Sequence, residues 1–498
     1  MIAQIPILIV VIPLISSVLC PLIGLWRKGV CYFWTVFSVS LCALASIDTL
    51  MTVMESGTIH YRLGGWAPPF GIEYVVDHLN AMMLVVVSVI SLIVAIYSKR
   101  SVEEELPDKV VYFYTVFLLQ VTGFLGIVIT GDLFNLYVFL EVGSLAGYVL
   151  IAVGEDGAPL ATFRYIVMGT IGACFYLLGI GYIYVSTGSL NMADLQQILP
   201  ELYHSKVILT AVAFLLAGLA VKMALFPVHV WLPDAYTKAP SATSALVAPL
   251  MTKISLYVMI RVLFTVFKPH LSLELLPVAD IMVWAGVIAI LGGAIMALAQ
   301  TDFKRMLCYV VVAEVGYIVG GAGLGNTIGM QGAILHILND AVMTVGLFTV
   351  AGIIVYKTKS HNISDFKDLF KKMPFTMAAF VVVALSIIGV PPTCGFFSKW
   401  YLLQGAVIAE HWAFLAALLL SSLISVILFF RVIEIAYDFH ASHGHGGHTH
   451  GTGHAQIIDE APLSMLLPTI VIAIAIILIG LYNQTILSEI IAFAVPKL

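Results

Sequence analysis

The chain has 498 residues, of which 61% are hydrophobic and 10% are charged, and its formal net charge is −5. A soluble globular protein carries about 25% charged residues, so the composition excludes that class and indicates a polytopic membrane protein. The small net charge gives no sign of nucleic-acid binding. Six cysteines, none in a CxxC pair, predict neither a disulfide framework nor a metal cluster.

Apolar runs of about 20 residues are long enough to span a hydrocarbon core about 30 Å thick. They predict an all-α fold with about fourteen transmembrane helices. The predicted helices are centred near residues 13, 42, 87, 120, 142, 173, 220, 254, 288, 315, 342, 388, 424 and 475. Alternate connections carry fourteen Lys and Arg residues on one side and four on the other. The positive-inside rule therefore places the first side in the cytoplasm and both termini outside.

Two of the predicted spans contain prolines that break a helix. The seventh, over residues 206–236, contains Pro227 and Pro233, and the twelfth contains Pro391 and Pro392. Proline supplies no N–H, and backbone freed at membrane depth is tolerated only where it is buried in protein or lines a watery cavity. The breaks lie five spans apart, and EVGSLAGYVL at 141–150 is echoed by EVGYIVGGAG at 314–323. Spans four to eight and nine to thirteen are therefore predicted to form two five-helix repeats of inverted topology.

This pattern predicts five successive segments along the chain. They are an N-terminal three-helix segment over 1–108, a first repeat over 109–268, a second repeat over 269–439, a His-rich cytoplasmic loop over 440–460 and a C-terminal helix over 461–498.

Glu141 is a carboxylate inside a predicted membrane span. At about 1.5 Å per residue it lies roughly 15 Å from Gly131, near the middle of the hydrocarbon core. An unpartnered charge at that depth costs at least a few kcal/mol, so such residues are usually paired and belong to ion pathways or proton relays. The sequence therefore predicts a partner for Glu141 elsewhere in the chain.

Three lysines lie within predicted spans. Lys222 precedes the first break and either snorkels to an interface or is buried. Lys253 lies about 20 Å along its helix from Pro240, without an acidic neighbour within one turn, and is expected to titrate. Lys399 follows the second break by about 12 Å and is expected to join a relay.

The sequence leaves two interpretations open for Glu314 and for His229, and it places His336 and Asp340 on one helix face. Glu314 is deep and either joins the relay or pairs with a nearby helix or subunit, and His229 is either a relay group or a structural histidine. His336 and Asp340 share one helix face, where they could exchange a proton.

Charged residues near the predicted helix ends have simpler interpretations. Asp302, Lys304 and Arg305 are expected in a solvated cytoplasmic turn, whereas three others are assigned to packing or gating. These three are Asp132, Arg164 and Asp234.

The tract HASHGHGGHTHGTGH at 440–454 contains six histidines, including His443, His445, His448 and His450. It is a weak candidate for metal binding because no spacing in it fixes a geometry, and a flexible cytoplasmic loop is the alternative. No cofactor is predicted.

Several motifs together resemble one known family. They are GDLFNLYVFLEVGSLAGYVL, the break that contains Lys222, APSATSALVAPLMTKISLYVMIR, TDFKRMLCYVVVAEVGYI and GVPPTCGFFSKWYLL. In this order they resemble the antiporter-like subunits shared by complex I, membrane-bound hydrogenases and Mrp-type cation/proton antiporters. Lys253 makes the D subunit of the Mrp-type antiporter look most similar.

The resemblance implies fourteen helices in two inverted units, each with a half-channel at its broken helix. Glu141 would match the family's fifth-span glutamate and pair with Lys222, Lys253 would be the central lysine, and Lys399 would lead to the exit. One position departs from the family pattern: Thr344 stands where relatives commonly have a basic residue. The path from Lys253 to Lys399 would then use His336, water or Glu314.

The predicted function is proton translocation through this Glu/Lys relay, as one subunit of an ion-pumping complex in a prokaryotic cytoplasmic membrane. The chain has no catalytic chemistry of its own. Its expected partners are other membrane subunits, including antiporter-like and small helical ones, with H⁺ and in some complexes Na⁺ as the transported ion. A complex I-like or hydrogenase-type redox pump is the main alternative, and a secondary solute transporter or a structural scaffold are lesser ones.

Overall fold

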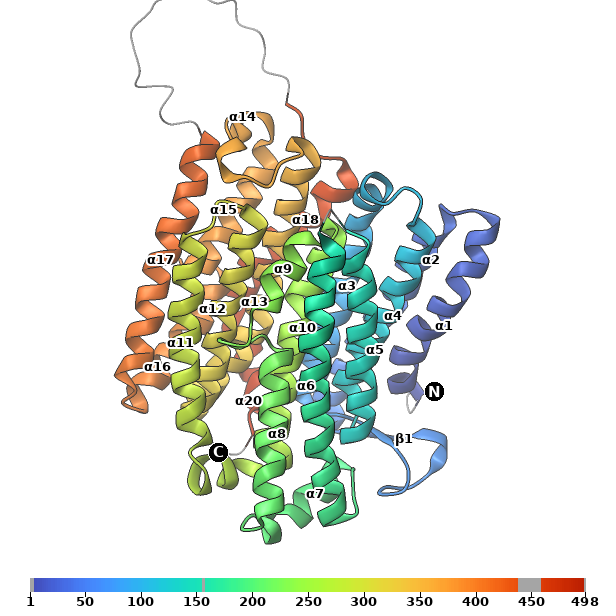
Figure 1. The fold of residues 1–498 in the computed structure, drawn as a ribbon, viewed down its shortest axis with the longest axis vertical. Coiled ribbons are helices and arrows are strands. Elements are labelled where there is room, and N and C mark those ends of the chain that lie inside the picture. The colour runs from blue at the N-terminus through green and yellow to red at the C-terminus, as the bar shows by residue number, and fades with distance from the viewer. Residues whose placement is uncertain (1–3, 155–156, 438–457, 497–498) are drawn as a thin grey trace, which may run out of the picture.

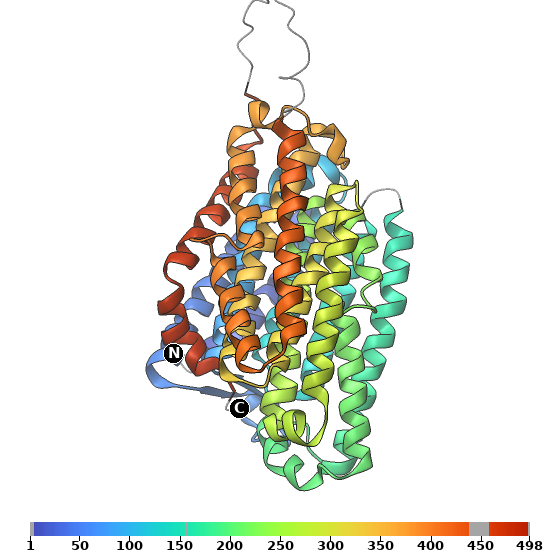
Figure 2. The same cartoon turned by 90° about the vertical axis from the view of Figure 1, so that its left-hand side faces the viewer.

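The computed structural model describes residues 4–154, 157–437 and 458–496. It is almost entirely helical, and the long helices pack side by side (Figures 1 and 2). In the described part, twelve helices are long and apolar enough to cross a membrane. They are α1 (Ile5–Trp26), α2 (Val30–Ser56), α3 (His78–Glu105), α4 (Val110–Ile129), α5 (Leu133–Ala152), α6 (Ala158–Thr187), α10 (Ser241–Ile260), α11 (Val278–Leu298), α12 (Phe303–Gly323), α13 (Thr327–Thr358), α17 (Trp412–Tyr437) and α18 (Leu463–Leu481).

Two further apolar segments are each divided into two helices. The first comprises α8 (Lys206–Lys222) and α9 (Trp231–Lys238), and the second comprises α15 (Pro374–Ile388) and α16 (Cys394–Ile408). The interruptions lie where the prolines predict them. With the twelve continuous helices, these segments would account for the predicted fourteen spans, and the exact number that crosses a bilayer stays a prediction.

Each interruption begins with a residue in the left-handed backbone region. Ala224 has φ of 54° and Gly389 has φ of 93°, a conformation that stops an α-helix and that glycine adopts without steric cost. The carbonyl groups at the helix end then need donors from elsewhere. One of them, the Val221 carbonyl of α8, accepts a hydrogen bond from Trp231 Nε1 of α9 at 3.0 Å. The Trp231 indole thus connects the two helices across the first interruption.

Short elements lie at the ends of the bundle. The strands β1 (Ile59–Arg62) and β2 (Glu73–Val76) form an antiparallel hairpin, with Ile59 opposite Val76. The short helices are α7 (Met192–Ile198), α14 (Leu369–Lys372), α19 (Asn483–Ile486) and α20 (Ala492–Ala494). Figure 1 shows α1 beginning and α20 ending toward the end that carries β1 and α7, with α14 at the opposite end. Both ends of the described chain therefore lie toward the same end of the bundle.

The same turn follows α6 and α13. The pattern Thr-x-Ser-x-Asn occupies residues 187–191 and 358–362. In each turn the threonine hydroxyl accepts a hydrogen bond from the serine N–H, at 3.2 and 3.3 Å. In each, the asparagine also forms a backbone bridge with an aspartate that begins a helix, Asp132 or Asp302. The first turn leads into α7 and the second toward α14, at opposite ends of the molecule (Figure 1). This recurrence supports the predicted inverted repeats.

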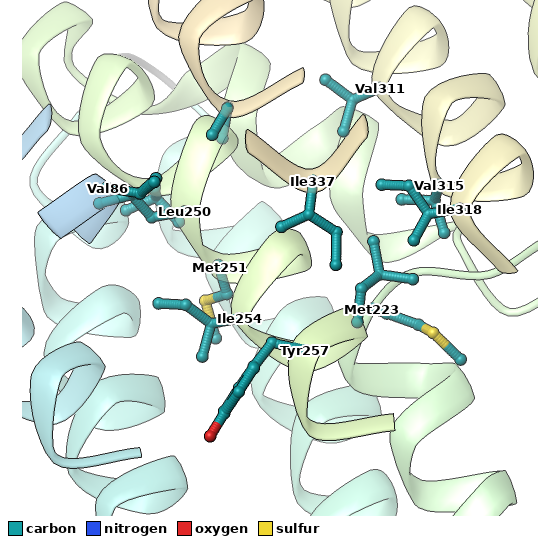
Figure 3. Packing of buried hydrophobic residues seen from close by; sticks show 14 of the residues in the cluster. Val86, Met223, Leu250, Met251, Ile254, Tyr257, Val311, Val315, Ile318 and Ile337 are labelled. Carbon is teal, nitrogen blue, oxygen red and sulfur yellow. The ribbon is translucent and has the colours of Figure 1, made fainter. Parts of the chain in front are cut away.

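The centre of the bundle is formed by α10, α12 and α13. The apolar stretches of α10 and α12 are entirely buried, whereas those of α1 and α17 are only one-third buried. Figure 3 shows part of this packing, with Leu250 and Ile254 of α10, Val315 of α12 and Ile337 of α13 in one buried cluster. The peripheral helices present apolar side chains outward, as a bilayer requires. The protein is therefore a multi-pass membrane protein whose most buried helices carry its deepest charges.

The structure corrects the prediction for Lys304. Asp302 caps α12 by accepting a hydrogen bond from the Arg305 backbone N–H at 2.9 Å, and Lys304 therefore belongs to the helix. Lys304 is 1% exposed and donates to the Ala239 carbonyl at 2.8 Å. The solvated-turn prediction is wrong for this residue because α12 begins one residue before it.

The exposed charges nearby form a cluster of ion pairs. Asp234 of α9 accepts from Arg164 of α6 at 2.7 Å and lies 3.3 Å from Arg305 of α12. The carboxylate thus ties α9 to two neighbouring helices, consistent with the packing role predicted for Arg164 and Asp234.

Candidate functional site

Within the described residues, the charged side chains that the sequence proposes as relay residues fall into three groups, and the first joins α5 to α8. Lys222 is the last residue of α8, where the helix dipole favours a cation. Its ammonium lies 3.2 Å from Glu141 Oε1 and donates to Ser144 Oγ at 2.8 Å. The Lys222 side chain is 2% exposed and that of Glu141 is 28% exposed. The structure therefore places Glu141 and Lys222 together, as the family resemblance implies, and buries the lysine.

The second group joins α10 to α13. The Lys253 ammonium lies 2.8 Å from Asp340 Oδ2, and both side chains are completely buried. Thr344, one turn beyond Asp340, accepts a hydrogen bond from Lys253 at 3.3 Å and donates one to Asp340 Oδ1 at 2.8 Å. The threonine hydroxyl thus bridges the two charges of the pair.

The second group was only partly predicted. Lys253 lacks an acidic neighbour within its own helix, but Asp340, 87 positions away, supplies its counter-ion. Thr344, the departure from the family pattern, acts here as a neutral hydrogen-bond bridge. The spacing of Asp340 from His336 suggested a proton exchange between these two, yet each binds a different partner in the structure.

The third group joins α12, α13 and α16. His336 Nε2 lies 2.6 Å from Glu314 Oε2, and its Nδ1 lies 2.8 Å from Ser398 Oγ. Lys399 is 4.0 Å from Glu314 Oε1. Glu314 thus pairs with groups on nearby helices, which was one of its two predicted interpretations.

Lys399 also closes the second break. Its ammonium donates to the Ile387 carbonyl of α15 at 2.5 Å, so the side chain reaches back across the interruption. It lies 4.8 Å from the centre of the Tyr317 ring, a cation–π contact. Lys399, like the Trp231 indole in the first half, donates a hydrogen bond to a carbonyl of the helix that precedes the interruption. Unlike the indole, the Lys399 side chain is ionisable.

His229 lies in the first break and is 3% exposed. Its ring stacks on Phe226 with centroids 4.8 Å apart, and its Nδ1 has no hydrogen-bond partner among the described residues. The structure does not join His229 to any of the three groups. His443, His445, His448 and His450, the weak metal candidates, lie outside the described residues.

The three groups follow one another across the bundle. α10 packs against both α8 and α13, and α13 packs against α12 and α16. Figure 1 shows α5, α10, α13, α12 and α16 in this order across the bundle. A file of ion pairs at membrane depth can hold and pass protons, because each carboxylate or amine can exchange one with its neighbour.

Comparison with known proteins places this geometry in a family. Residues 130–425 match the family described as "NADH:quinone oxidoreductase/Mrp antiporter, TM", a region that covers more than half of the chain and contains all three groups. The chain belongs to this family.

Relatives in the NADH:quinone oxidoreductase/Mrp antiporter family include subunits of both kinds of complex. The chain is 44% identical to the N subunit of NADH-quinone oxidoreductase from Desulforudis audaxviator, over 100% of this chain and 99% of that protein. It is 32% identical to the D subunit of the Na(+)/H(+) antiporter from Alkalihalophilus pseudofirmus, over 80% of each. The predicted family is confirmed, and the higher identity is with the complex I-type subunit.

A solved structure supports the fold over its full length. A chain of the membrane-bound sulfane sulfur reductase, an archaeal respiratory membrane complex, superimposes with a TM-score of 0.89 at 28% identity. The match covers 99% of this chain and 97% of that one. The chain therefore shares the fold of that protein over nearly the full length of both.

Proposed function

We propose that this chain translocates protons as one subunit of a multisubunit membrane complex, and that Glu141, Lys222, Lys253 and Lys399 form its relay. The observation that carries the proposal is the file of three buried charge groups between α5 and α16. Buried charges in a bilayer are costly and are usually retained for ion transport. Membership of the antiporter family supports the same function.

The first group acts as a gate. When Glu141 binds Lys222, the lysine's charge is largely cancelled for groups elsewhere. When this pair opens and the Lys222 ammonium moves toward Lys253, its positive charge repels the proton there. Two unit charges 4 Å apart at an effective dielectric near 20 interact by about 4 kcal/mol, equivalent to about three powers of ten in proton occupancy.

The second group holds the proton in the resting state. Asp340 is the counter-ion of Lys253, and Thr344 hydrogen-bonds to both. Repulsion from Lys222 must therefore overcome this pairing before Lys253 releases a proton. Because of this counter-ion, Lys253 releases its proton only when the Glu141–Lys222 pair opens, and it retains the proton while that pair is closed. The second group is therefore called the proton store.

The third group receives the proton. His336 and Glu314 lie within hydrogen-bonding distance, and Lys399 lies beside the same carboxylate. Imidazole exchanges protons readily near neutral pH. His336 and Glu314 thus provide the connection toward Lys399, as the departure at Thr344 led us to expect, and Asp340 belongs to the store. His229 is not assigned a relay step.

Glu141→Gln and Lys253→Met test the relay in the assembled complex. Each variant should abolish proton transport, measured in membrane vesicles with a fluorescent pH-gradient probe, while the complex still assembles. Arg164→Gln is the matched control, because it removes an ion pair that is more than half exposed on its arginine side. Full transport by both relay variants would refute the proposal.

A redox-driven complex is the second candidate for the surrounding assembly. It is favoured by the 44% identity with an NADH-quinone oxidoreductase subunit over the full length of both proteins. Purification of the native complex decides between the two. Iron–sulfur or hydrogenase-like subunits that copurify with the chain would indicate redox drive, whereas small membrane subunits alone would indicate a cation/proton antiporter that exchanges Na⁺ or another cation for H⁺.

The partners are other membrane subunits of the same complex, as in the respiratory complex that contains the structural relative. We place the chain in a prokaryotic cytoplasmic membrane, since the two sequence relatives reported above are bacterial and the structural relative is archaeal. The end that carries β1 and α7 would face outward, and the end that carries α14 and most basic residues would face the cytoplasm.

A further inference from the structure

A further ion pair, between Arg261 and Asp77, lies at the end of the bundle that carries α7. Arg261 is 9% exposed and directs two nitrogens at the Asp77 carboxylate, at 2.6 and 2.8 Å. Asp77 begins α3, where it also accepts from the backbone N–H groups of Leu79 and Asn80. The pair is thus bidentate and fixed from both sides, and the proposed relay does not use it.

This ion pair borders a cavity that opens at the same end. The cavity has a volume of about 140 Å³ and lies between β2, α3, the α4–α5 turn, α7 and the π-helix Arg261–Val266 that follows α10. Its polar lining comes from Asp77, Asn80, Thr130, Gln196, Arg261 and Thr265. A polar cavity of this size holds several water molecules, so water can reach the outer side of the ion pair.

The inner side of the ion pair leads toward Lys253. Lys253 and Tyr257 are four residues apart on one face of α10, and Arg261, the first residue of the π-helix that continues α10, follows four residues later. Arg261 Nε donates to the Tyr257 hydroxyl at 3.3 Å, and that hydroxyl donates to the Val128 carbonyl at 3.0 Å. Figure 3 shows the Tyr257 hydroxyl directed away from the apolar side chains around it. Eight residues of helix separate the backbones of Arg261 and Lys253 by about 12 Å along the axis, and we take this as the approximate separation of the two charges.

We propose that Arg261, held by Asp77, is an electrostatic plug that prevents protons on Lys253 from leaking into the cavity at the α7 end. The proposal rests on the relay function proposed above. A guanidinium stays protonated at physiological pH, so it cannot pass a proton on, and its positive charge repels one that approaches. Its position between the cavity and Tyr257 is where a short circuit of the relay would otherwise run.

The size of the expected leak follows from the charge and its distance. One unit charge about 12 Å from the relay lysine, at an effective dielectric near 20, changes proton occupancy by about tenfold. Asp77 offsets part of this charge, but its side chain is 30% exposed against 10% for Arg261, so the cation is the inner member of the pair. Arg261→Gln should therefore raise passive proton flux by up to about tenfold.

The test measures passive proton flux in proteoliposomes that contain the complete purified complex, with a potassium diffusion potential and an internal pH dye. Arg261→Gln should leak, whereas Asp77→Asn should stay tight because it breaks the same pair but retains the cation. Equal leaks in both variants would show that the ion pair acts as a mechanical fastening and would overturn the plug. Tyr257→Phe removes the hydroxyl that holds Arg261 Nε and decides the matter if Arg261→Gln does not assemble. An unchanged flux in Tyr257→Phe would then refute the proposal.

A double variant separates this proposal from the relay itself. Arg261→Gln combined with Lys253→Met should be tight again, because the leak requires the relay lysine. A persistent leak would show a path that bypasses Lys253 and would overturn the plug. Failure of the relay proposal has a different signature, namely full driven transport by the Lys253→Met single variant.

Discussion

The completely buried pair of Lys253 and Asp340 gives the sharpest prediction. Asp340→Asn keeps the size of the side chain but removes its charge, and so leaves the Lys253 ammonium without a counter-ion. Removal of one partner from a buried ion pair costs about 3–5 kcal/mol. Neither side chain is exposed, so solvent does not reduce this cost. Thr344 retains one hydrogen bond to the ammonium, which offsets about 1 kcal/mol, and we expect about 3 kcal/mol of destabilisation.

The double variant Lys253→Met with Asp340→Leu should recover most of this stability. Apolar replacement of both members of a buried ion pair is often neutral or stabilising. Proton transport, however, should be absent from the double variant, because the store for the proton is gone. Stability and transport would thus separate: the single variant is weak in both, and the double variant is stable but inactive.

The assay is thermal unfolding of the detergent-solubilised complex, followed by loss of its size-exclusion peak, together with proton transport in vesicles. Thr344→Val is the control, since it removes one neutral hydroxyl and should cost only about 1–2 kcal/mol. If the double variant is as unstable as Asp340→Asn, or if Asp340→Asn is as stable as the wild type, the two residues are not a mutually dependent pair and the reasoning is wrong.

Three further predictions concern other parts of the bundle. Ser398→Ala removes the hydroxyl that hydrogen-bonds to His336 and should slow transport about fivefold, the equivalent of one hydrogen bond, in vesicles with unchanged amounts of complex; an unaltered rate would show that this hydrogen bond does not set the imidazole's orientation. Burial alone would raise the pKa of Asp77, but the Arg261 guanidinium and the hydrogen bonds to the carboxylate outweigh burial and lower the pKa. The free energy of unfolding should therefore fall as the pH drops below about 4. Asp77→Asn should remove this part of the decrease in a pH series of thermal unfolding, and an identical decrease in the variant would contradict the assignment. A Cβ on Gly395 would lie 2.0 Å from a backbone oxygen of α15, whereas one on Gly181 meets nothing within 4 Å; Gly395→Ala should thus reduce the yield of assembled complex and Gly181→Ala should not, and equal yields would show that the second break tolerates repacking.

The sequence predicted those features that depend on position along one helix. Glu141 and Lys222 could be identified because depth and a nearby break mark each of them separately, and the cost of a lone charge requires that such residues find partners. The prolines located both interruptions to within a few residues. The echo of EVG at 141–143 and 314–316 pointed to the relation between the two halves.

The pairing of Lys253 with Asp340 could not be predicted in the same way. Helical periodicity tells which residues share a face, but it does not tell which helices lie next to each other. Asp340 and His336 share a face of α13, yet they bind to α10 and to α12 and α16 respectively. The prediction for Lys304 was wrong because the neighbouring charges Asp302, Lys304 and Arg305 suggested a solvated loop. Asp302 instead caps α12, so that Lys304 already belongs to the helix.

The hydrogen bond from Lys399 to the Ile387 carbonyl can stabilise the end of α15 in both protonation states of the lysine. A charged lysine has three N–H donors, and a neutral one retains two. The hydrogen bond that completes the end of α15 can therefore persist whether the amine carries a proton or has just released one. In the proposed relay, the support of the broken helix would then be independent of turnover, so the passage of a proton would leave the backbone around Lys399 intact.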